Sequence, residues 1–171
     1  MKKPLTRFVF AVLPLLLLTI SCSNKAVSYY NQGVQTYELG NYRDAISLYT
    51  KAIDIDPDYA EAYCNRGLVY SDLGEYSRAL FDYNRALELK PNYVFVYNNR
   101  GINYNRIYEY SKAISDFSKA IELDPNLAEP YYGRGLSYYH TDNKIKACED
   151  LKKAYSLGLL EANRYLVDLC K

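Results

Sequence analysis

The chain of 171 residues holds few side chains whose type and spacing could support catalysis. Its single histidine, His140, stands beside Thr141 and Asp142, with no cysteine or serine arranged around it as a nucleophile. Covalent catalysis needs a base within hydrogen-bond reach of the nucleophile, and a zinc site needs clustered ligands. The four cysteines form no Cys-x-x-Cys pair. The sequence therefore predicts no enzyme, no metal or cofactor site and no small-molecule substrate.

Cys22 is the cysteine whose surroundings indicate a chemical modification. Residues 1–7 carry three basic side chains, residues 8–20 are mainly apolar, and Ser21 is small. This order is typical of a secretory signal peptide. The apolar run covers thirteen residues, whereas a membrane-spanning helix needs about 20. We therefore expect residues 1–21 to be a cleaved leader.

The leader's last residues, Thr19 to Cys22, resemble the lipobox of bacterial lipoproteins, with Thr19 in the slot that usually holds leucine. The resemblance implies that Cys22 receives a diacylglyceryl thioether, becomes the first residue and is acylated on its amine. Several acyl chains anchor a protein more firmly than the marginal single chain. We expect residues 22–25 to be a short tether that holds an exported protein on the bacterial cell membrane or outer membrane. The alternative is a plain signal peptide and a secreted, lipid-free protein.

Charge argues against nucleic acid as a partner. Lys and Arg number 21 and Asp and Glu number 20, which leaves a formal charge of +1. Loss of the leader's three basic residues makes the remaining chain slightly acidic. Nucleic-acid binding depends on an excess of basic side chains that neutralise phosphates. No such excess is present.

A period of 34 residues organises the chain after the leader. A glycine, a tyrosine four residues before it and two alanines recur at this spacing in four copies. Several series in one register indicate repeated supersecondary units that stack on one another. The series are Gly33, Gly67, Gly101 and Gly135; Tyr29, Tyr63, Tyr97 and Tyr131; Ala45, Ala79, Ala113 and Ala147; and Ala52, Ala86, Ala120 and Ala154.

The residue types within each copy resemble the tetratricopeptide repeat family. The resemblance implies two antiparallel helices per copy, stacked into a right-handed superhelix with a concave face. The spacing of Tyr63, Gly67 and Tyr70 also predicts a helix directly, because these residues fall on one helical stripe. We therefore expect an all-α fold. It is an α-solenoid of four hairpins at residues 26–59, 60–93, 94–127 and 128–161, followed by a capping helix at 162–171.

The same resemblance implies a peptide-binding groove on the first helix of each copy. Asparagines two residues before the glycine could bond an extended peptide backbone, and aliphatic residues one after it could provide apolar contacts. The alternative for the asparagines, left open, is that they bond neighbouring copies. The family's carboxylate-binding set is not expected, because the chain has Asn65 of that set but Tyr30, Val34, Phe95 and Asn99 occupy its other slots. The predicted groove residues are Asn31, Asn65, Asn99, Leu68, Ile102, Leu136, Tyr132 and Tyr139.

Most of the 21 tyrosines repeat the same few packing slots. Those that fall on groove-facing slots lie in the first and last copies, at Tyr30, Tyr37, Tyr132 and Tyr139. A binding aromatic is therefore expected at an end of the groove. Three further repeated residues, Arg66, Arg100 and Arg134, are interpreted as structural arginines whose aliphatic stems lie along the packing face.

Cys148 and Cys170 lie at similar distances on either side of a turn at Gly158. In an antiparallel hairpin such residues face each other, so a disulfide could hold the cap in place. Two buried free thiols are the alternative. Taken together, the sequence predicts a membrane-anchored scaffold that binds a protein or peptide partner. The competing prediction is a structural or accessory subunit that packs a partner on its outer face.

Overall fold

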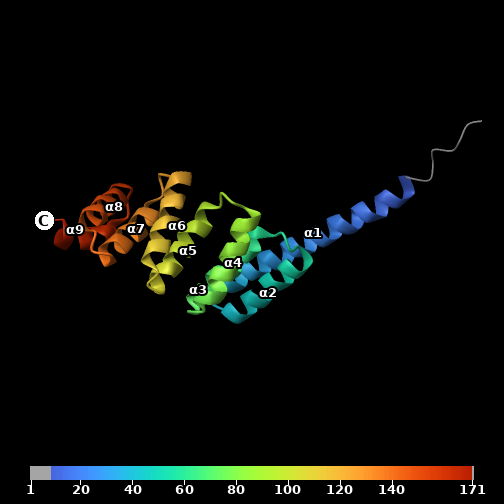
Figure 1. Cartoon of the computed structure of the whole chain (residues 1–171). Coiled ribbons are helices and arrows are strands. Elements are labelled where there is room, and N and C mark those ends of the chain that lie inside the picture. The colour runs from blue at the N-terminus through green and yellow to red at the C-terminus, as the bar shows by residue number, and fades with distance from the viewer. Residues whose placement is uncertain (1–8, 171) are drawn as a thin grey trace, which may run out of the picture.

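A computed structural model describes residues 9–170, and these form a row of α-helices in chain order (Figure 1). The all-α solenoid predicted from the sequence is confirmed, because consecutive helices pair into four antiparallel hairpins. Within the described residues the helices are α1 (Val9–Glu38), α2 (Tyr42–Ile55), α3 (Ala60–Asp72), α4 (Tyr76–Leu89), α5 (Val94–Arg106), α6 (Tyr110–Leu123), α7 (Ala128–His140) and α8 (Lys144–Ser156), then the short 3-10 turn η1 (Leu160–Ala162) and α9 (Asn163–Leu169).

Each hairpin closes on an aromatic or leucine side chain that faces the repeated glycine. In the second copy the Tyr83 ring is fully buried, and a Cβ on Gly67 would lie 2.8 Å from it. Phe117 fills the same place against Gly101 in the third copy. A larger residue than glycine would push the two helices apart, since protein interiors hold few voids that could absorb it. The period of glycines is therefore a period of close helix contacts.

The turn between the two helices of a hairpin needs a left-handed residue. Gly40 and Gly74 adopt φ values of 78° and 75°, which cost glycine little. The third and fourth copies place Tyr108 and Asp142 in this slot, with φ values of 63° and 59°. All four hairpins thus turn the same way, although only two of them have glycine there.

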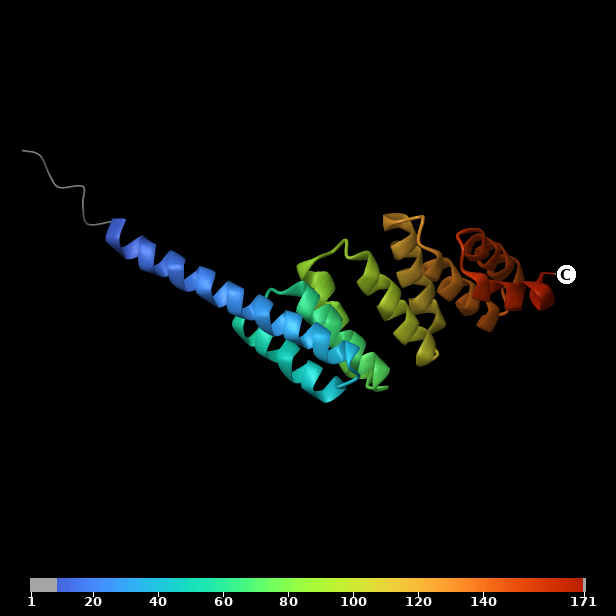
Figure 2. The same ribbon diagram turned by 180° about the vertical axis from the view of Figure 1, so that it is seen from behind.

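The first helix is longer than the others and extends away from the stacked body (Figures 1 and 2). It runs without a break through residues 22–25, the expected tether. Residues 1–8 of the expected leader and Lys171 of the expected cap lie outside the described residues. Across residues 9–170, no helix combines the length and the apolar character that crossing a bilayer requires. The leader and the lipid on Cys22 stay predictions.

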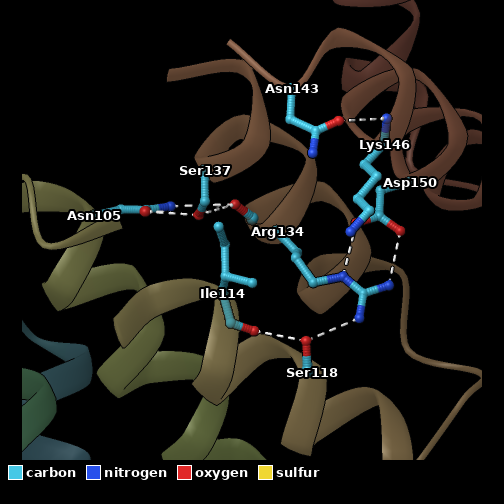
Figure 3. A network of polar contacts seen from close by, with 9 residues as sticks. Asn105, Ile114, Ser118, Arg134, Ser137, Asn143, Lys146 and Asp150 are labelled. Carbon is cyan, nitrogen blue, oxygen red and sulfur yellow. Dashed lines mark hydrogen bonds and ion pairs between the residues drawn. The ribbon is translucent and has the colours of Figure 1, made fainter. Parts of the chain in front are cut away.

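Each repeated arginine forms an ion pair with a buried aspartate. Arg66 contacts both carboxylate oxygens of Asp82 at 2.8 Å, and its third nitrogen donates to the Thr50 hydroxyl in the preceding copy. Figure 3 shows the fourth-copy equivalent, in which Arg134 lies between Asp150 and Ser118. The arginines are structural, as predicted. The sequence analysis did not identify the aspartate that pairs with each guanidinium.

The carboxyl end of the solenoid is covered by η1 and α9, which pack on α8. The buried residues Leu151, Ala154 and Ala162 form the core of this contact, with Tyr165 and other partly buried side chains around it. A disulfide joins Cys148 to Cys170, across the turn at Gly158, which has φ 100°. The structure thus contains the first of the two alternatives for these cysteines.

Candidate functional site: the inner face of the solenoid

The first helices of the copies form one side of the solenoid, which we call the inner face. Each of α1, α3 and α5 contacts the first helix of the following copy as well as its own partner. Within residues 9–170 the second helices make no comparable contacts with one another. The row of first helices is therefore the tighter side of the curve. The predicted groove residues all lie on these helices.

The amino-terminal half of the inner face is joined by hydrogen bonds within the protein. The Asn65 amide donates to the Tyr30 hydroxyl at 3.0 Å, and the Tyr37 hydroxyl donates to Asp72 Oδ2 at 2.7 Å. Burial raises the pKa of both tyrosines, so the phenols stay protonated at neutral pH. Asn65 thus bonds a neighbouring copy, which was the alternative for the asparagine row. Asn31 is exposed, while Leu68 and Asn99 are half-buried.

Two serine–asparagine pairs connect the first helices further along the chain. The Ser71 hydroxyl lies 2.5 Å from Asn103 Oδ1, and the Ser137 hydroxyl donates to Asn105 Oδ1 at 2.7 Å. Asn105 also donates to the Gly133 carbonyl at 3.2 Å, and part of this network is visible in Figure 3. Sequence reasoning missed these pairs. Their signal is a spacing of 32 residues, which is two short of the repeat.

The carboxyl-terminal half of the inner face opens into a hollow of about 500 Å³, which we call the apolar hollow. Its volume falls in the range of roughly 300 to 1,000 Å³ that is usual for ligand sites. It lies between α5, α7 and the segment that leads into the cap. The lining residues are Ile102, Asn105, Arg106, Phe117, Glu129, Tyr132, Gly133, Leu136, Leu159 and Glu161.

Gly133 lines the apolar hollow and makes room for the Phe117 ring, which forms part of the wall. The three earlier copies have asparagine in this slot. A Cβ on Gly133 would lie 2.4 Å from Phe117 Cζ, and one on Gly101 would lie 2.9 Å from the same ring. The Phe117 ring is therefore held between two glycines on consecutive first helices. It is fully buried in the solenoid, and it forms part of the wall of the hollow.

The rim of the apolar hollow carries charge of both signs. Glu129 and Glu161 are exposed. Arg106 donates to the Ser71 carbonyl at 3.3 Å, which directs its guanidinium toward α3. Tyr132 lies edge-on to Tyr165 with ring centroids 6.0 Å apart. Burial, followed by the proximity of Tyr165, raises the pKa of Tyr132 to about 12, so its hydroxyl remains a neutral donor at physiological pH.

The structure brings together three of the predicted groove residues. Ile102, Tyr132 and Leu136 all line the apolar hollow. Tyr139 lies about one helical turn after Leu136, and the centroid of its ring is 6.4 Å from that of Tyr165. Asn31, Asn65, Asn99 and Leu68 are not among the residues of the hollow. Sequence reasoning missed Phe117 and Leu159, because the first belongs to a second helix and the second departs from the proline that ends the earlier copies.

Comparison with known proteins identifies the class. A family model described as "TPR repeat" matches residues 33–74 and 109–142, and one described as "Tetratricopeptide repeat" matches residues 60–93. Together these matches cover more than half of the chain, so the protein belongs to the tetratricopeptide repeat family. Proteins of this family are protein–protein interaction scaffolds and are usually not enzymes. In the described part of the chain no three His, Cys, Asp or Glu side chains gather as metal ligands would.

Several solved structures are similar to this chain. "MamA 41-end" from Desulfovibrio magneticus RS-1 has a TM-score of 0.77 at 24% identity, over 83% of this chain and 81% of that one. "First TPR of Spaghetti (RPAP3) bound to HSP90 peptide SRMEEVD" has a TM-score of 0.69 at 28% identity, over 70% of this chain and 95% of that one. No curated protein sequence matches the chain.

Proposed function

We propose that this protein is a membrane-anchored scaffold that binds an extended segment of a partner protein on its inner face, with the main anchor in the apolar hollow. The observation that carries the proposal is the hollow itself, which is about 500 Å³ in size and places Ile102, Leu136 and Tyr132 around one space. A bulky apolar side chain in such a site contributes affinity through the area it removes from water. The Spaghetti domain, which is bound to an HSP90 peptide according to its title, supports a peptide as the kind of partner.

The amino-terminal half of the inner face has a different part in this proposal. Its polar groups at Tyr30, Asn65, Tyr37 and Asp72 already bond one another. A peptide would have to break these bonds before it could use the groups, which lowers any net gain. That half therefore stiffens the solenoid, and the partner's strongest contacts lie between α5, α7 and the cap.

Site-specific photo-crosslinking in the native envelope tests this proposal. A photoreactive amino acid at Leu136, inside the apolar hollow, is expected to capture the partner. The matched control places the same residue at Phe81, an α4 side chain that is 68% exposed outside the hollow. Capture at position 81 but not at 136 would contradict groove binding and would favour a subunit that packs its partner on the outer face.

Membrane anchoring rests on Cys22 and the leader before it. If Cys22 is acylated, radiolabelled fatty acid is expected to enter the wild-type protein and to be lost in Cys22→Ala. The other cysteines serve as the internal control, because Cys64→Ala should label like the wild type. Equal labelling of wild type and Cys22→Ala would contradict the anchor without touching the proposal on peptide binding.

A further inference from the structure

A second hollow of about 400 Å³ lies at the carboxyl-terminal end of the solenoid, and we call it the basic hollow. Its lining comes from three helices: Tyr139 from α7, Lys144 from α8, and Arg164, Tyr165 and Leu169 from α9. Two cationic side chains and two phenols thus converge on one space. Cationic donors and neutral hydroxyl groups together are suited to a carboxylate, which accepts hydrogen bonds on both oxygens.

The two hollows share an aromatic wall. The Tyr165 ring lies edge-on to Tyr132, which lines the apolar hollow, with centroids 6.0 Å apart. It also lies edge-on to Tyr139, a residue of the basic hollow, with centroids 6.4 Å apart. An extended peptide advances about 3.3 Å per residue. One of these ring-to-ring distances corresponds to about two residues of extended peptide, and the two together correspond to about four. Groups on one peptide that occupy both hollows are therefore separated by roughly two to four residues.

The charges around the basic hollow leave it available to an anion. Lys144 Nζ lies 4.0 Å from Asp142 Oδ1, and both side chains are mostly exposed. Such a surface pair is weak, so it competes little with a bound carboxylate. Arg164 lines the basic hollow beside Tyr165, and its side chain is exposed, so its guanidinium is accessible to a bound anion. Glu161 lines the apolar hollow together with Tyr132 and is not among the residues that line the basic hollow.

We propose that the partner segment carries a bulky apolar side chain and, about two to four residues away from it, a carboxylate that binds Lys144 and Arg164 in the basic hollow. The inference rests on the proposed function, because it assigns a second contact to the same peptide. The carboxylate can belong to an aspartate or glutamate side chain or to the end of the chain. If the carboxylate is the C-terminus of the peptide, an amide at that end removes the contact. If it belongs to an aspartate or glutamate side chain, the amide leaves the contact in place.

Synthetic fluorescent peptides and the full-length protein provide the test. Each peptide has one phenylalanine and one aspartate in a glycine–serine background, with the spacing varied from one to six residues, and fluorescence anisotropy reports the affinity. At the best spacing, which should lie within the two-to-four range, aspartate is expected to bind about tenfold more tightly than asparagine, as a charge-assisted hydrogen bond allows. A second pair of peptides has its C-terminus at the same spacing from the phenylalanine, and one member ends as a free acid whereas the other ends as an amide.

Variants separate the two contacts. Lys144→Gln and Arg164→Gln are each expected to remove most of the preference for aspartate, whereas Lys152→Gln, an exposed lysine of α8, should leave it unchanged. Leu136→Glu should weaken all phenylalanine peptides. If phenylalanine peptides bind but show no preference for the acid, the inference fails and the proposed function stands. If no phenylalanine peptide binds above a serine control, both fail. A preference that persists in the Lys144 and Arg164 variants also overturns the inference.

Discussion

The first and fourth repeats have the same hairpin but differ in the residues that connect them to their surroundings. The fourth has Arg134 paired with Asp150 and bonded to Ser118 of the third copy. The first has Gln32 and Leu48 in the corresponding slots. It also has no preceding copy that an arginine could reach. The difference indicates that the arginine couples neighbouring copies, and that a hairpin can fold without it.

The inner face also differs between the two ends of the solenoid. In the amino-terminal half, Asn65 donates to Tyr30 and the surface is joined across copies. In the carboxyl-terminal half, Gly133 stands where an asparagine would be, and the face is open. A solenoid made of equal repeats can therefore concentrate binding at one end by changing single slots.

The largest effect is expected from Arg134→Met. The change leaves the Asp150 carboxylate buried without its cation, and unpaired buried charges cost about 3 to 5 kcal/mol. Urea unfolding of the full chain, followed by circular dichroism, measures the loss. Gln32→Met, in the same slot of the first copy, is the matched control and should change stability little.

The double variant Arg134→Gln/Asp150→Leu copies the residues of the first repeat into the fourth. Removing both charges should recover most of the stability, since an apolar pair of similar size is often neutral. A double variant as unstable as Arg134→Met alone would show that the cost lies in lost packing or in the bond to Ser118, and not in an unpaired charge.

The next largest effect concerns the cap, which the first repeat lacks. Cys148 and Cys170 are 22 residues apart, and closing a loop of this size stabilises a fold by about 3 kcal/mol in the chain-entropy model. Cys170→Ser is expected to lower the melting temperature, and to weaken peptide binding because Leu159 and Glu161 form part of the hollow. Dithiothreitol should lower the melting temperature of the wild type but not that of the variant. An equal response of both would argue against this disulfide in solution.

Gly133→Asn restores the residue of the other copies and should fill the apolar hollow. The Phe117 ring leaves no room for its Cβ, and overpacking of this kind costs about 1 to 3 kcal/mol. Peptide binding should fall to background. Phe117→Leu tests the cause, because a shorter side chain should reduce the cost of Gly133→Asn in a double-mutant cycle while binding stays lost. Additive losses of stability would contradict a direct clash.

The parts of the fold that repeat could be predicted from the sequence, because a period of 34 recurs in glycines, tyrosines and alanines alike. The candidate site could be predicted only in part, for the opposite reason. It depends on departures from the period, such as Gly133 and Leu159, whose effect appears only when neighbouring copies are packed together. Asp82 and its equivalents are themselves periodic, 16 residues after each arginine. The spacing rules for a single helix do not bring residues so far apart into contact. The arginine–aspartate pairs could therefore be recognised only from the three-dimensional packing of the hairpin.

The smallest effect is expected at the amino-terminal end, from Tyr30→Phe. The change removes the hydroxyl that accepts from Asn65 and leaves the ring against Tyr59, 5.0 Å away between centroids. A partly buried hydrogen bond of this kind contributes about 1 kcal/mol to stability. Peptide affinity should stay within about twofold of the wild type, because the apolar hollow lies two copies further along. A large loss of affinity would mean that the partner also uses the closed half, and the contrast between the two ends would then concern stability alone.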